Sequence, residues 1–417
     1  MTKKLFSQIR NEWRANLWLA AELLIVSVVL WIVVGMLYDK VGTYLEPRGF
    51  NTEHCYRIML GELTDKSAGY QPYASQSERA ADIRELLNRL SHRPEVEAAS
   101  LSQNSYPYNG SNSGIQVSHD TLYTPQASYC VRRLVTPDFV RVFRYEGTRG
   151  ETPEQLAQML ERGELLASDN LYQENHHLSL TSLIGKQFYL GDDTTKSYKL
   201  GASLIPVRYD DYIPANRSLT MVYDLNRCDE GFLDSYIECC VRVREDQDHD
   251  FITRLKADSE KQFRVGNIYI AEVYSFTDLR RVFLRSDTNQ LRNYLTGCSF
   301  LLLNIFLGLL GTFWFRTLQR RGEIALHMVH GATRRQVFGR LVAEGVLILT
   351  IVTLPALVTD FLLAYFEVGL SLELGLDMLA ICALITYLLI LSMMLIGIGI
   401  PARKAMNIQP AEALHDE

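Results

Sequence analysis

The residues that come closest to a catalytic set are Lys66 and Ser67, at the end of the segment GELTDKS (61–67). A Lys–Ser pair behind a glycine-rich loop holds nucleotide phosphates in P-loop proteins. Here Lys66 stands where the second glycine of such a loop would be, so the backbone cradle for the phosphates is missing. We interpret the segment as a turn and expect no ATP to bind to this chain.

Candidate metal ligands are equally incomplete. The acidic segment before residue 251 carries three alternating aspartates, Asp246, Asp248 and Asp250. They match the start of a calcium-binding loop, but Phe251 replaces its glycine and Ala257 its bidentate glutamate, so they better suit an acidic helix start. The histidine pair at 176–177 lacks further ligands at zinc-site spacing. The sequence therefore predicts no catalytic residue, no cofactor and no metal site.

A basic segment, residues 316–345, has the pattern of a helix, a corner and a second helix. Ile324 and Met328 lie one helical turn apart, and Gly331 supplies the left-handed residue that ends a helix. Thr333 and Gln336 form a capping box for the next helix.

Five arginines flank this corner: Arg320, Arg321, Arg334, Arg335 and Arg340. Basic residues next to membrane helices favour the cytoplasmic face. We interpret the corner as a docking element lying against that face. The alternative is an ordinary charged loop between two membrane helices.

The corner resembles the signature of FtsX/MacB-type ABC transporter permeases, an EIxLR-type run, a GA turn, basic residues and a glutamate. The matching residues are Glu323, Ile324, Leu326, Gly331, Ala332, Arg334, Arg335 and Glu344, and His327 departs from the arginine common in the family. The C-terminal segment PARKAMNIQPAEALHDE (401–417) is similar to the family's PARRA…P.EALR ending. The resemblance implies that a separate ABC ATPase docks at Glu323, Ile324, Leu326, Gly331, Ala332, Thr333, Arg334 and Arg335.

Four apolar runs, 17–38, 295–315, 341–366 and 376–400, are each able to cross a bilayer core that needs about 20 helical residues. The rest of the chain, mostly 39–294, is polar. A net charge of −6 and arginines clustered near the apolar runs argue against nucleic acid as a partner. We predict an α-helical membrane protein with four transmembrane helices and a large α+β extracytoplasmic domain.

Basic residues set the predicted orientation. Four lie in the first 16 positions and six between Arg316 and Arg340, against none in the link 367–375. We predict a protein of the bacterial inner membrane with cytoplasmic termini. Its domains are an interfacial helix with the first span (1–38), an extracytoplasmic core domain (39–294) and a permease domain with three spans (295–417).

Two carboxylates lie within the apolar runs, Glu22 and Asp360. A charge at the bilayer centre costs about 2.5–3.5 kcal/mol on insertion scales. A role in transport or proton relay and a packing role both stay open. Asn304 suits an interhelical hydrogen bond.

Residues 39–294 alternate strand and helix signals. A strand at 55–60, a helix announced by a Ser75–Glu78 capping box and a strand at 96–101 form one βαβ unit, and a second follows at 236–274. Between them we predict a helix from Thr152 to Gly163 and a hairpin at 186–207. Two βαβ halves with an inserted β-rich lobe resemble the MacB-like core domain, whose V.PDYF run is similar to VTPDFVRVF (135–143).

Of the seven cysteines, two fall in apolar runs, and the five outside them are Cys55, Cys130, Cys228, Cys239 and Cys240. An odd number cannot all pair internally, and Cys239 and Cys240 point to opposite faces of one strand. One disulfide and buried apolar thiols both stay open.

These features favour the membrane subunit of an ABC transporter. It would couple ATP hydrolysis by a separate ATPase to movements of its extracytoplasmic domain, for export or extraction of a lipophilic or envelope ligand. The alternative, a non-transport sensor or regulator of envelope or cell-wall enzymes, would need an output domain that the short basic cytoplasmic segments do not supply. A membrane-bound enzyme lacks its catalytic set. As further partners, the resemblance implies a second permease chain, membrane lipid and a periplasmic adaptor or envelope ligand.

Overall fold

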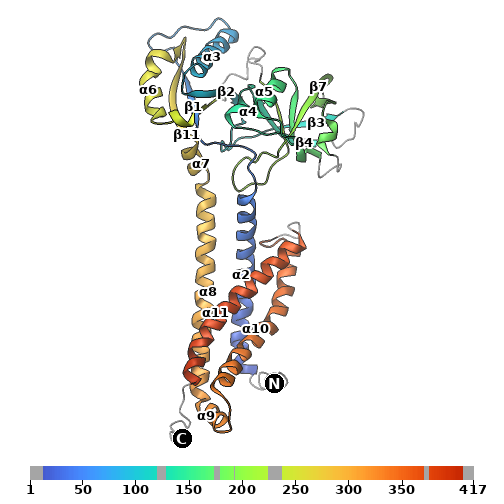
Figure 1. Ribbon diagram of the computed structural model, residues 1–417, viewed down its shortest axis with the longest axis vertical. Helices are drawn as coiled ribbons and strands as arrows, with labels where there is room; N and C mark the ends of the chain where they lie inside the picture. The colour runs from blue at the N-terminus through green and yellow to red at the C-terminus, as the bar shows by residue number, and fades with distance from the viewer. Residues whose placement is uncertain are drawn as a thin grey trace. The chain divides into compact units, whose positions relative to one another are not determined.

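The computed structural model describes residues 13–119, 128–172, 179–191, 193–223, 237–370 and 375–406. The chain forms two compact units (Figure 1). Met1–Gly42 and Asp287–Glu417 make up the membrane unit, and Thr43–Ser286 make up the α/β unit. The domain boundaries at residues 38 and 294, which concern the membrane edge, stay predictions.

The described residues of the membrane unit form four long helices and a short one: α2 (Trp13–Leu45), α8 (Arg285–Gln319), α10 (Arg334–Tyr365) and α11 (Leu376–Met406), with α9 (Arg321–Val329) as the short helix. The four long helices are apolar enough over a sufficient length to cross a membrane. With the α/β unit, they confirm the predicted fold class. The interfacial helix expected before residue 13 and the tail after residue 406 lie outside the described residues.

A shared apolar core holds the membrane unit together, with Leu30 and Trp31 from α2, Phe313 from α8 and Met394 from α11. The loop after α10 packs on α2, because Leu370 lies so close to Gly35 that a Cβ there would meet its side chain at 2.2 Å. The Trp31 indole donates a hydrogen bond to the Leu379 carbonyl at 3.3 Å.

The polar residues of the spans have different surroundings. Asp360 is buried, and Glu22 is half-buried beside Gly308 of α8. Asn304 is exposed on α8, so we find no support for the predicted interhelical bond among the described residues.

The α/β unit contains a four-stranded sheet in the order β11 (Ile268–Ser275), β1 (Cys55–Glu62), β9 (Glu238–Val243), β2 (Val96–Gln103), and all neighbours are antiparallel. The helices α3 (Gln76–Ser91) and α6 (Phe251–Gln262) pack against one face of it through a common core (Figure 1). A short β10 (Arg264–Val265) pairs with β11.

Both predicted βαβ units are present, but they are not separate halves. In the sheet, the two strands of each βαβ unit are separated by one strand of the other βαβ unit, which is the ferredoxin-like arrangement. The fully buried β9 explains this, because it pairs with β1 on one side and β2 on the other. Its Cys239 and Cys240 face different cores, as predicted.

The predicted β-rich lobe lies between β2 and β9 in the chain. Its strands are β3 (Ser113–His119), β4 (Ser128–Val135), β5 (Leu165–Ser168), β6 (Gln187–Leu190), β7 (Asp193–Leu204) and β8 (Ser218–Val222). They pair in the order β4-β3-β6-β7-β5-β8, and β8 pairs back with β4, so the lobe is a closed barrel. Its interior is filled by side chains such as Val117, Phe188 and Leu200.

The remaining helical segments of the α/β unit are short: α4 (Phe139–Val142), α5 (Pro153–Glu161), α7 (Phe276–Phe283), η1 (Asp169–Tyr172), η2 (Leu180–Leu183) and η3 (Glu245–Gln247). The helix predicted from Thr152 to Gly163 is confirmed as α5, where Thr152 and Gln155 form a capping box and Gly163 follows the helix with φ +76°. The capping box predicted at Ser75 is wrong. The Ser75 side chain makes no capping hydrogen bond. The Glu78 side chain instead accepts a hydrogen bond from the Ala74 amide at 2.9 Å.

The six cysteines among the described residues are all free, and those of the α/β unit are buried. Cys228 lies outside the described residues. For these six, the structure favours buried thiols over a disulfide.

Candidate functional site

The corner between α9 and α10 is shaped by Gly331, whose φ is +93°. The Ala332 amide donates to the His327 carbonyl and the Gly331 amide to the Met328 carbonyl, both at 3.0 Å. These two bonds form a Schellman motif, which ends α9 and requires a residue that tolerates positive φ. The prediction for Gly331 is confirmed.

The start of α10 is fixed by the predicted capping box. The Gln336 amide donates to Thr333 Oγ1 at 3.3 Å, and the Thr333 amide donates to Gln336 Oε1 at 2.8 Å. Each bond satisfies an amide that a helix start otherwise leaves unpaired. The direction of the chain through the corner is therefore set by local sequence at both ends.

A buried ion cluster anchors the corner to the helices beside it. Glu344 of α10 accepts bonds from Arg316 Nη1 of α8 at 3.1 Å and from Arg320 Nη1 at 3.2 Å. Only 3 % of the Glu344 side chain is exposed. We name Arg316, Arg320 and Glu344 the Glu344 clamp.

The Glu344 clamp was not predicted from the sequence, where Arg316 and Arg320 stand out only as basic residues near a span and Glu344 only as a motif residue. Arg316 and Arg320 are one helical turn apart, and this spacing is the signal that could have suggested a shared acidic partner.

A second, exposed charge group lies on the outer side of the corner. Glu323 Oε1 is 3.5 Å from Arg340 Nη2 and 3.6 Å from His327 Nε2. Arg340 Nη1 also lies 2.9 Å from His327 Nε2. An arginine in place of His327 could not accept this bond from Arg340. Because Glu323 is half-exposed, these pairs contribute little to stability.

A cavity of about 200 Å³ opens beside the corner. Glu323, His327 and Arg340 line its polar side, and Ile324, Val337 and Leu341 line its apolar side. The corner thus offers both charge and apolar surface.

The predicted site residues divide into two groups. Ile324 is buried in the core of the membrane unit, and Ala332 is half-buried. The others are exposed: Glu323, Leu326, Gly331, Thr333, Arg334 and Arg335. Val329, which is not among the predicted site residues, is 59 % exposed beside Leu326 at 50 %. We name Leu326, Val329, Arg334 and Arg335 the corner surface.

Metal chemistry finds little support in the described part of the chain, where no three His, Cys, Asp or Glu side chains group closely enough to hold an ion. Asp248 instead contacts His54 Nδ1 at 2.6 Å and the Tyr56 hydroxyl at 2.5 Å. The histidine pair at 176–177 lies outside the described residues.

Comparison with known families identifies the C-terminal region. Residues 297–410 match the family model described as FtsX-like permease C-terminal. The matched range contains the corner and the Glu344 clamp, and the match confirms the resemblance that the motifs indicated. A search of curated proteins finds no match to the chain.

Two solved structures are similar to part of the chain, each at 10 % sequence identity. The periplasmic region of MacB from Actinobacillus actinomycetemcomitans gives a TM-score of 0.32 and covers 57 % of this chain and 96 % of that one. The extracellular domain of the noncanonic ABC-type transporter YknZ from Gram-positive bacteria gives 0.30, with 52 % and 100 % covered. Both TM-scores are below 0.5, so neither similarity assigns a function.

Proposed function

Because residues 297–410 form an FtsX-like permease domain, we propose that this chain is the membrane subunit of an ABC transporter whose ATPase is a separate polypeptide. The observation that carries the proposal is the corner itself. It is capped at both helix ends and clamped to α8 and α10, while its outer surface stays exposed.

The chemistry of the corner surface supports an ATPase partner with an acidic and partly apolar face. Arg334 and Arg335 supply exposed positive charge, and Leu326 and Val329 supply apolar contact area. Charges at the rim of an interface mainly steer encounter and set its salt dependence, whereas desolvated apolar residues contribute more of the affinity. We expect a contact that salt weakens without abolishing.

The Glu344 clamp supports coupling. Since Arg316 belongs to α8 and Glu344 to α10, a push on the corner acts on both helices together. The chain runs from α7 directly into α8, so a movement of α8 has a covalent route to the α/β unit. In this proposal the corner and both termini are cytoplasmic, residues 39–294 are extracytoplasmic, and two permease chains act together on a lipophilic or envelope ligand.

Purification and reconstitution test this function. The full chain, purified in mild detergent, should bring down a P-loop ATPase, and ATP turnover should require that second polypeptide. ATP turnover that stays with this chain after stringent purification would contradict the proposal. So would a chain that never associates with an ATPase in its native membrane.

A further inference from the structure

The barrel lobe has no direct chain connection to the membrane helices. The segment that leaves α2 enters β1, and α7 carries the chain from β11 into α8. Both β1 and β11 belong to the ferredoxin-like sheet, whereas the lobe is inserted between β2 and β9. A movement that follows the chain therefore reaches the lobe only through that sheet.

A loop of the lobe nevertheless contacts the last turn of α2 and the segment that follows it. This lobe loop, residues 205–217, joins β7 to β8. The Arg208 amide donates to the Arg48 carbonyl at 2.9 Å, and the Arg208 guanidinium donates to the Thr43 carbonyl. The two backbone segments are in close contact at Gly49, where a Cβ would lie 2.5 Å from the Pro206 carbonyl oxygen.

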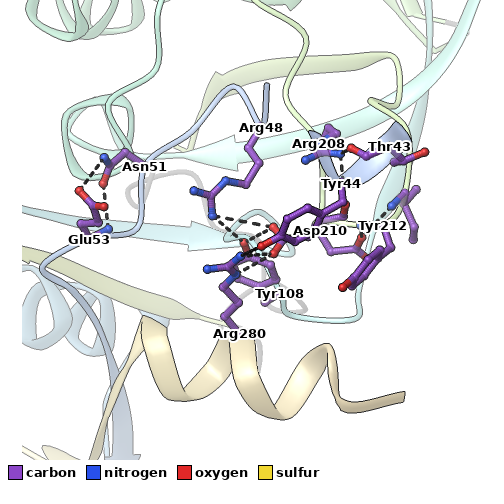
Figure 2. A network of polar contacts seen from close by, with 12 residues as sticks. Thr43, Tyr44, Arg48, Asn51, Glu53, Tyr108, Arg208, Asp210, Tyr212 and Arg280 are labelled. Carbon is purple, nitrogen blue, oxygen red and sulfur yellow. Dashed lines mark hydrogen bonds and ion pairs between the residues drawn. The ribbon is translucent and has the colours of Figure 1, made fainter. Parts of the chain in front are cut away.

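The same loop is tied to α7 by a buried carboxylate. Asp211 accepts a bond from Arg280 Nε at 2.7 Å and pairs with Arg280 Nη2 at 2.6 Å. The Tyr108 hydroxyl donates to Asp211 at 2.8 Å, and Arg48 Nη1 lies 3.8 Å from it. Figure 2 shows Arg48, Tyr108 and Arg280 converging on this point.

Aromatic contact completes the group, since the rings of Tyr44 and Tyr212 lie 5.5 Å apart between centroids (Figure 2). Asp210 stabilises the turn of the lobe loop, because it accepts hydrogen bonds from the Tyr212 amide at 2.7 Å and from the Ile213 amide at 2.8 Å. The lobe loop therefore has a fixed turn, and it contacts α7 on one side and the end of α2 with its following segment on the other.

Resting on the proposed function, we infer that Asp211 is the positioning residue of a joint that transmits movement of α7 and of the segment after α2 to the barrel lobe. We name Asp211, Arg280, Arg48 and Tyr108 the Asp211 joint. It gives the lobe a second route to the membrane connections that bypasses the ferredoxin-like sheet. The lobe would then turn together with α7.

The physical chemistry of the joint suits this role. Asp211 is 1 % exposed, and a buried carboxylate cannot leave its charged donors without a large desolvation cost. Arg280 Nε and Nη2 both contact Asp211 Oδ2, while the Tyr108 hydroxyl bonds to Oδ1, so both carboxylate oxygens are held. The contact therefore moves as one piece with α7 instead of sliding.

Two side chains on α7 allow a matched test. Arg280 enters the joint, whereas its neighbour Arg281 is 76 % exposed and, within the residues that the structure describes, forms its ion pair with Asp278. The full chain in lipid nanodiscs would carry spin labels at the exposed positions Lys196 in β7 and Val282 in α7. The measurements are the distance distribution between the labels and hydrogen exchange of the Arg208 amide.

Arg280→Gln should broaden the distance distribution and speed exchange at Arg208 by about tenfold or more, the effect of losing a charged hydrogen bond. Arg281→Gln should change neither. If Arg280→Gln also removes exchange protection from β9, the variant has damaged the fold itself. The Arg280→Lys variant, which keeps the positive charge, is then the deciding measurement. An intermediate exchange rate with β9 protected would support the joint.

The inference would be overturned if Arg280→Gln left both the label-to-label distances and the hydrogen exchange of the Arg208 amide as in the wild type. Where Arg280→Lys is the deciding variant, wild-type exchange of the Arg208 amide in that variant would overturn it. No ATPase is present in this experiment, so its failure leaves the docking proposal standing. Conversely, an intact joint would not rescue a chain that never binds an ATPase.

Discussion

Arg316, near the end of α8, donates a hydrogen bond at 3.1 Å to Glu344 in α10, and both side chains are almost fully buried. The two residues are 28 positions apart, and the whole corner lies between them in the chain. The contact therefore closes the base of the corner and fixes α9 between two long helices.

Glu344→Ala should destabilise the membrane unit strongly. It removes the carboxylate that Arg316 and Arg320 share, and breaking a buried pair costs about 3–5 kcal/mol. Glu323→Ala is the control, because its half-exposed pairs are worth at most about 1 kcal/mol. Thermal unfolding in detergent measures both, and equal small shifts would argue against the clamp.

Two glycines near the corner should respond to alanine in opposite directions. A Cβ would meet open space at both Gly331 and Gly339, so only the backbone differs. Gly331→Ala forces an L-residue into positive φ at a cost of about 1–2 kcal/mol. Gly339→Ala, inside α10, should stabilise the helix by up to about 1 kcal/mol. Shifts of the same sign in thermal unfolding would contradict the Schellman corner.

The buried thiols should resist labelling until the α/β unit unfolds. Burial raises the pKa of Cys239 and of Cys130 to about 12, and only the thiolate reacts. At pH 8 the thiolate fraction should be about 1,000-fold lower than for a thiol of pKa 9, and reaction should speed up as pH rises towards 12. Fast reaction of Cys239 with a thiol reagent at pH 8, before denaturant is added, would disprove this burial.

Topology can be tested with single cysteines at exposed positions on each unit. In cells with a permeabilised outer membrane and an intact inner membrane, Ser111→Cys should react with a membrane-impermeant thiol reagent. His330→Cys should react only after the inner membrane is permeabilised as well. This pattern follows from the asymmetry of basic residues. The reversed pattern would refute a cytoplasmic corner and the function built on it.

Local features of the fold could be predicted from the sequence, because the residues that determine them are neighbours in the chain. The Gly331 turn, the Thr333 capping box, the helix that begins after Thr152 and the four apolar spans are of this kind. The Ser75 capping box was predicted wrongly because a competing bond, donated by the Ala74 amide to the Glu78 carboxylate, is equally local and leaves no mark in the sequence pattern.

Long-range pairing could not be predicted in the same way. The position of β9 between β1 and β2, and the closure of β8 on β4, depend on strands far apart in the chain. The Glu344 clamp and the Asp211 joint are buried charge contacts between distant segments. In the sequence, the arginines, Glu344 and Asp211 look like ordinary charged positions, and Tyr108 looks like an ordinary aromatic residue.

The most direct test of the central claim compares two charge reversals in the membrane unit. Arg334→Glu with Arg335→Glu alters the corner surface, and Arg403→Glu with Lys404→Glu alters another exposed basic pair in α11. Co-purification of the ATPase with the full chain should fall sharply for the first pair, residual binding should depend less on salt, and the second pair should bind as wild type. ATPase binding that survives in the Arg334 and Arg335 variant, with unchanged salt dependence, would contradict docking at the corner.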